Sequence, residues 1–301
     1  MTIVKRIFLF VCINLLVVLS LSVLLNLLGV QPYLQQYGLD VRNLALFCFV
    51  WGMGGAFISL MLSRLMAKWL MGVKIIDPET TNIEERELVE CVRRLASNAG
   101  LNYLPQVGIY SSSEVNAFAT GPTQKKSLVA VSSGLLNRMD KYEIEAILGH
   151  ELSHIANGDM VTMTLLQGVV NAFVMFLARI IAFALSGLGR DRQSSSSLGS
   201  FRVFTFLFEL IFMIFGSMLV AAFSRYREFR ADKGGASIAG REKMIAALKT
   251  LRVMQEIKDP RLQEAPSMAA FKISAPAKRG WIQLFSTHPP LEERIARLER
   301  L

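Results

Sequence analysis

Four long hydrophobic runs limit what this 301-residue chain can fold into. Each is long enough to cross the hydrocarbon core of a bilayer as a helix, which takes about 20 mostly apolar residues. They raise the hydrophobic content to 52% and the mean hydropathy to +0.39, which is too apolar for an ordinary soluble enzyme. The runs are Ile7–Val30, Leu44–Leu62, Leu165–Leu188 and Val203–Phe223. The sequence therefore predicts an α-rich membrane protein with four hydrophobic helices, arranged as two hairpins.

Small and ionisable residues within the runs indicate how they pack. The second run contains Gly52, Gly54 and Gly55, and such small residues permit close approach of helices. The third run carries Arg179 and the fourth carries Glu209, which are unfavourable at this depth unless they are paired or face protein or water. The third and fourth runs either cross the bilayer or form a hairpin that enters it part-way, and the sequence leaves both open.

Basic residues set the expected orientation. Lys5 and Arg6 precede the first run and Arg64 and Lys68 follow the second, whereas the loop between these runs carries one Arg and one Asp. The positive-inside rule then places the N-terminus and the segment after the second run in the cytoplasm. The first run has no clear small-residue cleavage site, so we expect it to be retained. The net charge of +9 fits juxtamembrane positions better than nucleic-acid binding, because the chain has no nucleic-acid module.

Two of the three histidines flank a glutamate in the sequence His150-Glu151-Leu152-Ser153-His154. This H-E-x-x-H pattern is typical of metallopeptidases, because residues four apart on a helix share one face and both imidazoles can reach one metal ion. Glu151 lies about 100° further round the helix, where it can hold and deprotonate a water rather than ligate. The alternative is an ordinary helix whose two histidines lie on its surface or cap it.

The soluble segments show mixed helix and strand patterns. Apolar residues recur at helical spacing over 84–99, and Asp140 with Glu143 forms a capping box that begins the helix carrying the histidines. We expect extended segments at 107–110, 115–120 and 127–132, helices at 241–257 and 290–301, and a loop over 259–277. Asp159 is expected to cap the helix that leads into the third hydrophobic run.

A catalytic zinc site needs a third protein ligand and an open position for water. Glu228 is the preferred candidate, and Asp232 lies one helical turn later on the same face. Asp232 is placed to accept the N–H of a ligating histidine and so fix the orientation of its ring. The alternative for Glu228 is a surface ion pair with Arg225 or Arg227.

Three motifs together resemble the HtpX family of bacterial inner-membrane zinc proteases, which is related to the eukaryotic CAAX prenyl endopeptidases. They are H-E-L-S-H at 150–154, S-R-Y-R-E-F-R-A-D at 224–232 and S-T-H-P-P at 286–290. The resemblance covers nearly the whole chain. It implies one Zn²⁺ per chain held by His150, His154 and Glu228, with Glu151 as the general base. It also implies proteolytic quality control of damaged or misassembled membrane proteins under stress.

Two further elements are candidates for substrate handling. His288 either caps the last helix or donates to the oxyanion of the tetrahedral intermediate, and Arg294 is a second, more structural candidate. Asn116, Ala117 and Phe118 lie in an extended segment upstream of the active helix. Such a segment is either a plain core strand or an edge strand that holds the substrate backbone, and the resemblance favours the substrate role.

The expected architecture joins the four hydrophobic helices to an α+β zincin-like metalloprotease domain of the gluzincin type, facing the cytoplasm of a bacterium. The expected units are an N-terminal transmembrane hairpin (1–65), the first catalytic half (66–160), a second hydrophobic hairpin (161–224) and the second catalytic half (225–301). We expect the lipid bilayer and membrane-protein or unfolded-protein substrates as partners, and no nucleic acid. The alternatives are a narrow-specificity processing peptidase of the CAAX type and a membrane scaffold or chaperone with structural zinc. The sequence indicates no oligomeric state.

Overall fold

The structure is a computed structural model, and it describes residues 40–187, 196–256 and 280–301. The hydrophobic run 7–30 lies outside these residues, as do the tip of the loop between the third and fourth runs and the whole predicted loop 259–277. The chain divides into two compact units. The helical unit comprises Met1–Ser59 and Thr162–Val220, and the sheet unit comprises Leu60–Val161 and Ala221–Leu301.

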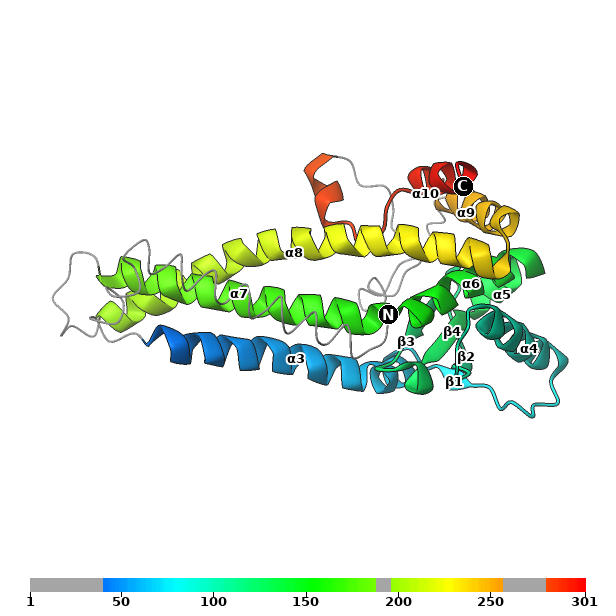
Figure 1. Cartoon of the computed structure of the whole chain (residues 1–301), viewed down its shortest axis with the longest axis horizontal. Coiled ribbons are helices and arrows are strands. Elements are labelled where there is room, and N and C mark those ends of the chain that lie inside the picture. Colours follow the sequence, from blue (N-terminus) through cyan, green and yellow to red (C-terminus); the bar gives the residue numbers. More distant parts are fainter. Residues whose placement is uncertain (1–39, 188–195, 257–279) are drawn as a thin grey trace. The chain divides into compact units, whose positions relative to one another are not determined.

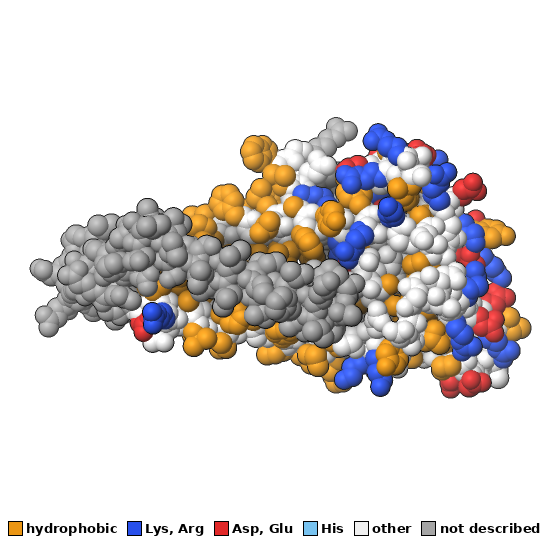
Figure 2. Space-filling model, in the orientation of Figure 1, with side chains coloured by type: hydrophobic (Ala, Val, Ile, Leu, Met, Phe, Trp, Pro, Cys, Tyr) orange, Lys and Arg blue, Asp and Glu red, His pale blue; other side chains and the backbone are white. Residues whose placement is uncertain are grey.

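Three helices in the described part of the chain are long and apolar enough to cross a membrane. They are α3 (Val41–Leu70), α7 (Asp159–Gly187) and α8 (Ser196–Ala239), and they carry the second, third and fourth hydrophobic runs (Figure 1). Large apolar side chains are exposed along α3 and α8, among them Trp51, Phe206 and Phe215, and hydrophobic side chains form much of the visible helical surface (Figure 2). Exposed apolar bands of this kind suit a lipid environment.

Within the helical unit, close contacts pack the helices as the sequence indicates. A Cβ added to Gly52 would lie 2.6 Å from the backbone nitrogen of Ala172, so α3 and α7 approach closely there, whereas Gly54 and Gly55 face open space. Arg179 donates from Nη1 to Oε1 of Glu209 at 2.6 Å, which pairs the two ionisable residues of the α7–α8 hairpin. Arg179 and Glu209, which the sequence predicts to need partners within the hydrophobic runs, are therefore paired with each other in the helical unit.

The sheet unit contains a four-stranded mixed sheet in the order β1-β2-β4-β3. Its strands are β1 (Lys74–Ile75), β2 (Gln106–Tyr110), β3 (Ala117–Thr120) and β4 (Leu128–Ser132). β2 pairs with β4 in parallel, and the other two pairings are antiparallel. The three predicted extended segments are confirmed as β2, β3 and β4, and β1 was not predicted.

Helices cover one face of this sheet and bury the main core. The side chains of this core come from four helices and from alternate strand residues such as Val129 and Val131. The helices are α4 (Ile83–Asn98), α6 (Lys141–Asn157), α9 (Arg241–Glu256) and α10 (Leu291–Glu299). A smaller cluster on the other face contains Tyr110, Phe118 and Leu128. Three short elements complete the unit. η1 (Gln124–Lys126) precedes β4, α5 (Ser133–Arg138) follows β4, and η3 (Gly280–Phe285) precedes α10.

Candidate metal centre

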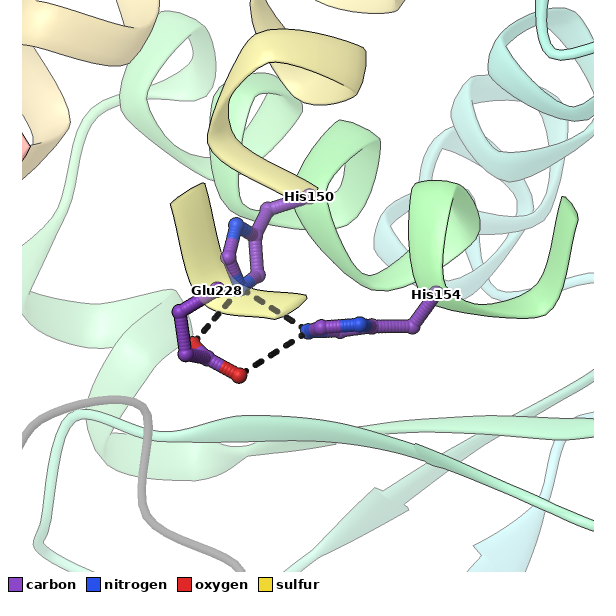
Figure 3. Close-up of side chains that lie close together, drawn as sticks. All are labelled: His150, His154 and Glu228. Atoms are coloured by element: carbon purple, nitrogen blue, oxygen red, sulfur yellow. Dashed lines mark hydrogen bonds and ion pairs between the residues drawn. The ribbon is translucent and has the colours of Figure 1, made fainter. Parts of the chain in front are cut away.

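Helix α6 places both histidines of the H-E-x-x-H motif on one buried face. The helix begins with the predicted capping box, in which Asp140 accepts from the backbone of Glu143, and it ends at Gly158 in the left-handed conformation with φ 64°. His150 and His154 are buried, and their Nε2 atoms lie 3.2 Å apart. Glu228 reaches them from α8 and is fully buried (Figure 3).

The Nε2 atom of each histidine lies beside a different oxygen of Glu228, at a distance close to the separation of two ligands on one zinc ion. Nε2 of His150 lies 3.4 Å from Oε2 of Glu228, and Nε2 of His154 lies 3.4 Å from its Oε1. Zinc ligands at about 2.0–2.1 Å in tetrahedral geometry are separated from one another by about 3.3–3.4 Å. The three residues form the one group among the described residues whose ligand atoms could hold a metal ion together. The donor set therefore fits zinc with one position left for water.

Glycines let α8 approach α6 closely enough for Glu228 to reach the histidines. A Cβ on Gly235 would lie 2.9 Å from the backbone nitrogen of His150 and 3.1 Å from its Cα. On α6, a Cβ on Gly149 would lie 3.0 Å from Cβ of Ala239. Because backbone atoms cannot rotate away as a side chain can, the separation of the two helices depends on Gly235.

Asp232 lies beside the ring of His150, in the position that the sequence predicts. Its Oδ1 lies 3.0 Å from Nδ1 of His150. Arg294 of α10, which is completely buried, donates to both oxygens of Asp232 at 2.8 and 2.6 Å. Arg294 therefore acts through Asp232: its guanidinium binds the carboxylate of Asp232, which in turn contacts His150.

Asp159 plays the equivalent part for His154, and the sequence did not reveal it. Asp159 is the first residue of α7, and its Oδ2 lies 2.7 Å from Nδ1 of His154. Its Oδ1 accepts from Nη2 of Arg230 at 2.7 Å. The signal that could have revealed this contact is the short spacing after the motif, because Gly158 turns the chain and returns Asp159 toward the last turn of α6.

Burial and ion pairing perturb the ionisation of these groups. Burial lowers the pKa of His150, but hydrogen bonds to Asp232 and Glu228 outweigh it and raise the pKa to about 9. Burial raises the pKa of Glu228, yet the neighbouring His288, His150 and His154 hold it well below the ordinary value. Arg294 likewise overcomes the effect of burial on Asp232 and lowers its pKa to about 2. Glu228 and Asp232 thus stay ionised although they are buried.

The remaining catalytic candidates also lie beside the ligands. Glu151 follows His150 on α6 and is 6% exposed. Nδ1 of His288 lies 2.9 Å from Oε2 of Glu228, so the structure brings His288 against a ligand carboxylate. Arg225 anchors the chain just before His288 by donating to the carbonyls of Leu284 and Ser286 at 3.1 and 2.7 Å.

The predicted substrate segment forms the start of β3 and lies at an edge of the sheet. Asn116 is buried and its backbone N–H donates to Oγ of Ser132. Ala117 packs into the main core, while Phe118 lies against Tyr110 on the opposite face. The side chains of Ala117 and Phe118 are therefore core residues, and a substrate would contact the backbone of the strand rather than these side chains.

Comparison with known proteins identifies the family. Residues 82–301 match the model of peptidase family M48. This chain belongs to peptidase family M48. It is similar to the Protease HtpX homolog of Bacillus velezensis, with 47% identity over 301 residues that cover 98% of this chain and 99% of that protein. It is also similar to the Protease HtpX homolog of Thiobacillus denitrificans, with 50% identity over 294 residues that cover 98% of each.

The crystal structure of S. mikatae Ste24p matches this M48 chain with a TM-score of 0.57 and 16% identity, covering 98% of this chain and 67% of that one. At this identity the likeness concerns the fold alone. M48 is a metallopeptidase family, and the HtpX relatives match over nearly their whole length. Together with the three candidate spans, these matches show that the protein is a multi-pass bacterial membrane metalloprotease. The resemblance derived from the three sequence motifs is confirmed.

Proposed function

We propose that this M48 protein is a zinc-dependent endopeptidase of the bacterial inner membrane, with its catalytic residues on the cytoplasmic side. The close approach of His150, His154 and Glu228 carries the zinc assignment. The basic residues that flank the second hydrophobic run support the cytoplasmic orientation. Two imidazoles, one carboxylate and an open position are the ligand set of a catalytic rather than a structural zinc.

The side chains of the centre divide the catalytic work. When bound, zinc supplies Lewis-acid chemistry that polarises the scissile carbonyl and acidifies water. Glu151 takes the proton of the attacking water and delivers it to the leaving amine. Asp232 and Asp159 fix the rings of His150 and His154, so each presents Nε2 to the ion.

Two further groups act on the substrate in this proposal. His288 donates to the oxyanion of the tetrahedral intermediate, and the contact of its Nδ1 with Oε2 of Glu228 holds the ring beside the metal centre. β3, which begins after Asn116 and is the outermost strand of the described sheet, adds the substrate backbone as a further strand. Recognition through the backbone suits a peptidase that degrades many sequences, which supports quality control of damaged or misassembled membrane proteins.

Metal analysis and peptide cleavage test this function on three proteins side by side. Wild type should hold one zinc per chain and cleave casein. Glu151→Gln should retain the zinc and lose cleavage, because the ligands are intact and the base is absent. Glu228→Ala should lose both. Cleavage by Glu151→Gln at the parental rate would refute the mechanism.

A further inference from the structure

A groove with a volume of about 840 Å³ opens in the sheet unit between α4 and the first turns of α6. None of the three metal ligands lines it. The last residue that α6 contributes is Glu145, five residues before His150, which is about 7.5 Å along a helix. The groove is therefore separate from the metal centre but built on the same helix.

The floor of the groove is apolar. Leu88 and Met139 lie there and are buried, and the half-buried Ile109, Leu136 and Ile144 complete the apolar lining. Such a floor can cover the aliphatic part of a ligand, because burying apolar surface is favourable in proportion to its area.

Carboxylates surround this floor. The lining contains five glutamates against one arginine and one lysine, in a chain whose net charge is +9. Glu87 is paired with Lys141 at 2.6 Å. Glu145 is paired with Arg94 and Lys243; burial raises its pKa, but the hydrogen bonds from these two cations outweigh it and lower the pKa overall.

Three glutamates of the lining are left without a cationic partner among the described residues: Glu84, Glu85 and Glu90. Glu84 and Glu85 lie in the first turn of α4, where the helix dipole favours acids. Glu90 lies in the middle of α4, where the helix dipole does not favour an acidic side chain. The groove thus carries an excess of negative charge on a protein that is otherwise strongly basic.

The arrangement suits an extended cationic chain rather than a metal ion. Within the described part of the protein, no set of these glutamates brings three ligand atoms close enough to share an ion, since the metal centre is the one such group found. Lysine and arginine combine an aliphatic stem with a charged end, and they lay the stem on apolar surface while the charge reaches outward. An apolar floor with a carboxylate rim is complementary to such side chains.

We propose that this groove is an exosite for Lys- and Arg-rich segments of the polypeptide substrate. The inference rests on the proposed function, because membrane-protein substrates carry such segments on the cytoplasmic flanks of their transmembrane helices. The groove binds the basic flank and raises the local concentration of the neighbouring chain at the metal centre. Membrane proteins are thereby favoured over neutral unfolded chains.

The first measurement is binding without cleavage. Full-length Glu151→Gln protein in detergent is titrated into a fluorescein-labelled soluble peptide with four lysines and arginines among glycine and serine, and into the same peptide with glutamine at the basic positions. The basic peptide should bind about tenfold more tightly at low salt, since each of several exposed ion pairs contributes about a factor of two or three. Adding Glu84→Gln, Glu85→Gln and Glu90→Gln should remove the difference.

A matched control changes net charge equally elsewhere in the sheet unit. Glu242, Glu292 and Glu299 are exposed on α9 and α10 and do not line the groove. Their triple replacement by glutamine should leave the preference for the basic peptide intact. Equal binding of both peptides to the Glu151→Gln protein, or an equal loss of preference in the control, would overturn the exosite.

The second measurement separates the exosite from the proposed function. Zinc-loaded protein in phosphatidylcholine liposomes is given two single-span substrates that differ only in a basic or a neutral flank. Wild type should cleave the basic one with a kcat/KM about tenfold higher, and the groove triple variant should cleave both at the rate of wild type on the neutral one. Preferential peptide binding without cleavage of either substrate supports the exosite and overturns the peptidase function instead.

Discussion

Replacing Gly235 with alanine should weaken metal binding while leaving the protein folded. The new methyl would lie 2.9 Å from the backbone nitrogen and 3.1 Å from Cα of His150, so α6 and α8 must separate by about half an ångström to restore an ordinary contact. Overpacking of this kind costs about 1–3 kcal/mol, and the gain in helix propensity from glycine to alanine offsets about 1 kcal/mol of it. The expected net loss of stability is therefore at most about 2 kcal/mol.

The metal centre is more sensitive than the fold to this displacement. Glu228 is on α8 and both histidines are on α6, so any separation acts directly on the two 3.4 Å distances between the imidazole nitrogens and the carboxylate oxygens. Catalytic geometry tolerates about 0.5 Å, and disturbing the groups that orient metal ligands typically costs 10- to 100-fold in metal affinity. We expect zinc affinity and casein cleavage to fall within that range.

Chelator competition measures the zinc affinity, and thermal unfolding of the metal-free protein in detergent measures the stability. Gly55→Ala on α3 is the matched control, because Gly55 is also in a helix but an added Cβ meets nothing within 4 Å. Gly55→Ala should gain about 1 kcal/mol of stability from the higher helix propensity of alanine, and it should keep wild-type zinc affinity. If Gly235→Ala also binds zinc as tightly as wild type, the close approach of α6 and α8 does not set the site geometry.

Three further outcomes are expected. Asp159→Asn should lower zinc affinity about 10- to 100-fold in the same chelator competition, because His154 loses the carboxylate that orients its ring. Arg294→Met should lower the free energy of unfolding by about 3–5 kcal/mol, since it leaves Asp232 buried without its cationic partner, and denaturant unfolding checks it. Glu145→Gln should lower stability by less than about 1 kcal/mol at neutral pH. Because the folded pKa of Glu145 is depressed, this difference should be present above about pH 4.3 and vanish as the pH falls through the folded pKa in a series of melts.

The parts of the site that could be predicted are those fixed by spacing within one helix. His150, Glu151 and His154 follow from a four-residue interval, and Asp232 follows Glu228 by the same interval on α8. Contacts between distant segments could not be predicted in this way. The pairing of Arg294 with Asp232 joins positions 62 residues apart, and local sequence carries no information about which buried carboxylate an arginine will meet.

The fold shows the same division. The strands and α4 followed from local patterns, and α4 begins one residue before its expected start, after Asn82 as N-cap. The change from apolar to charged residues near Phe223 favours a boundary between units, but it does not end the helix. One helix of 44 residues, α8, extends from Ser196 to Ala239 and runs through this point. Composition changed there while helix propensity did not, because arginine and glutamate are as favourable in a helix as leucine.

The charges of the buried acids and of the arginines around the candidate metal centre explain why these residues occur together. Asp232 and Asp159 each have an arginine of their own, Arg294 and Arg230, and are neutralised by it. Glu228 and Glu151 are the two other buried carboxylates among the described residues of this cluster, and Nη2 of Arg227 lies 3.3 Å from Oε1 of Glu228.

Burial lowers the pKa of His150 and His154, but hydrogen bonds to Asp232, Asp159 and Glu228 outweigh it and raise the pKa of both histidines. Arg294 and Arg230 neutralise Asp232 and Asp159, whereas Glu228 faces His150 and His154, between which the metal ion of the proposed function would bind.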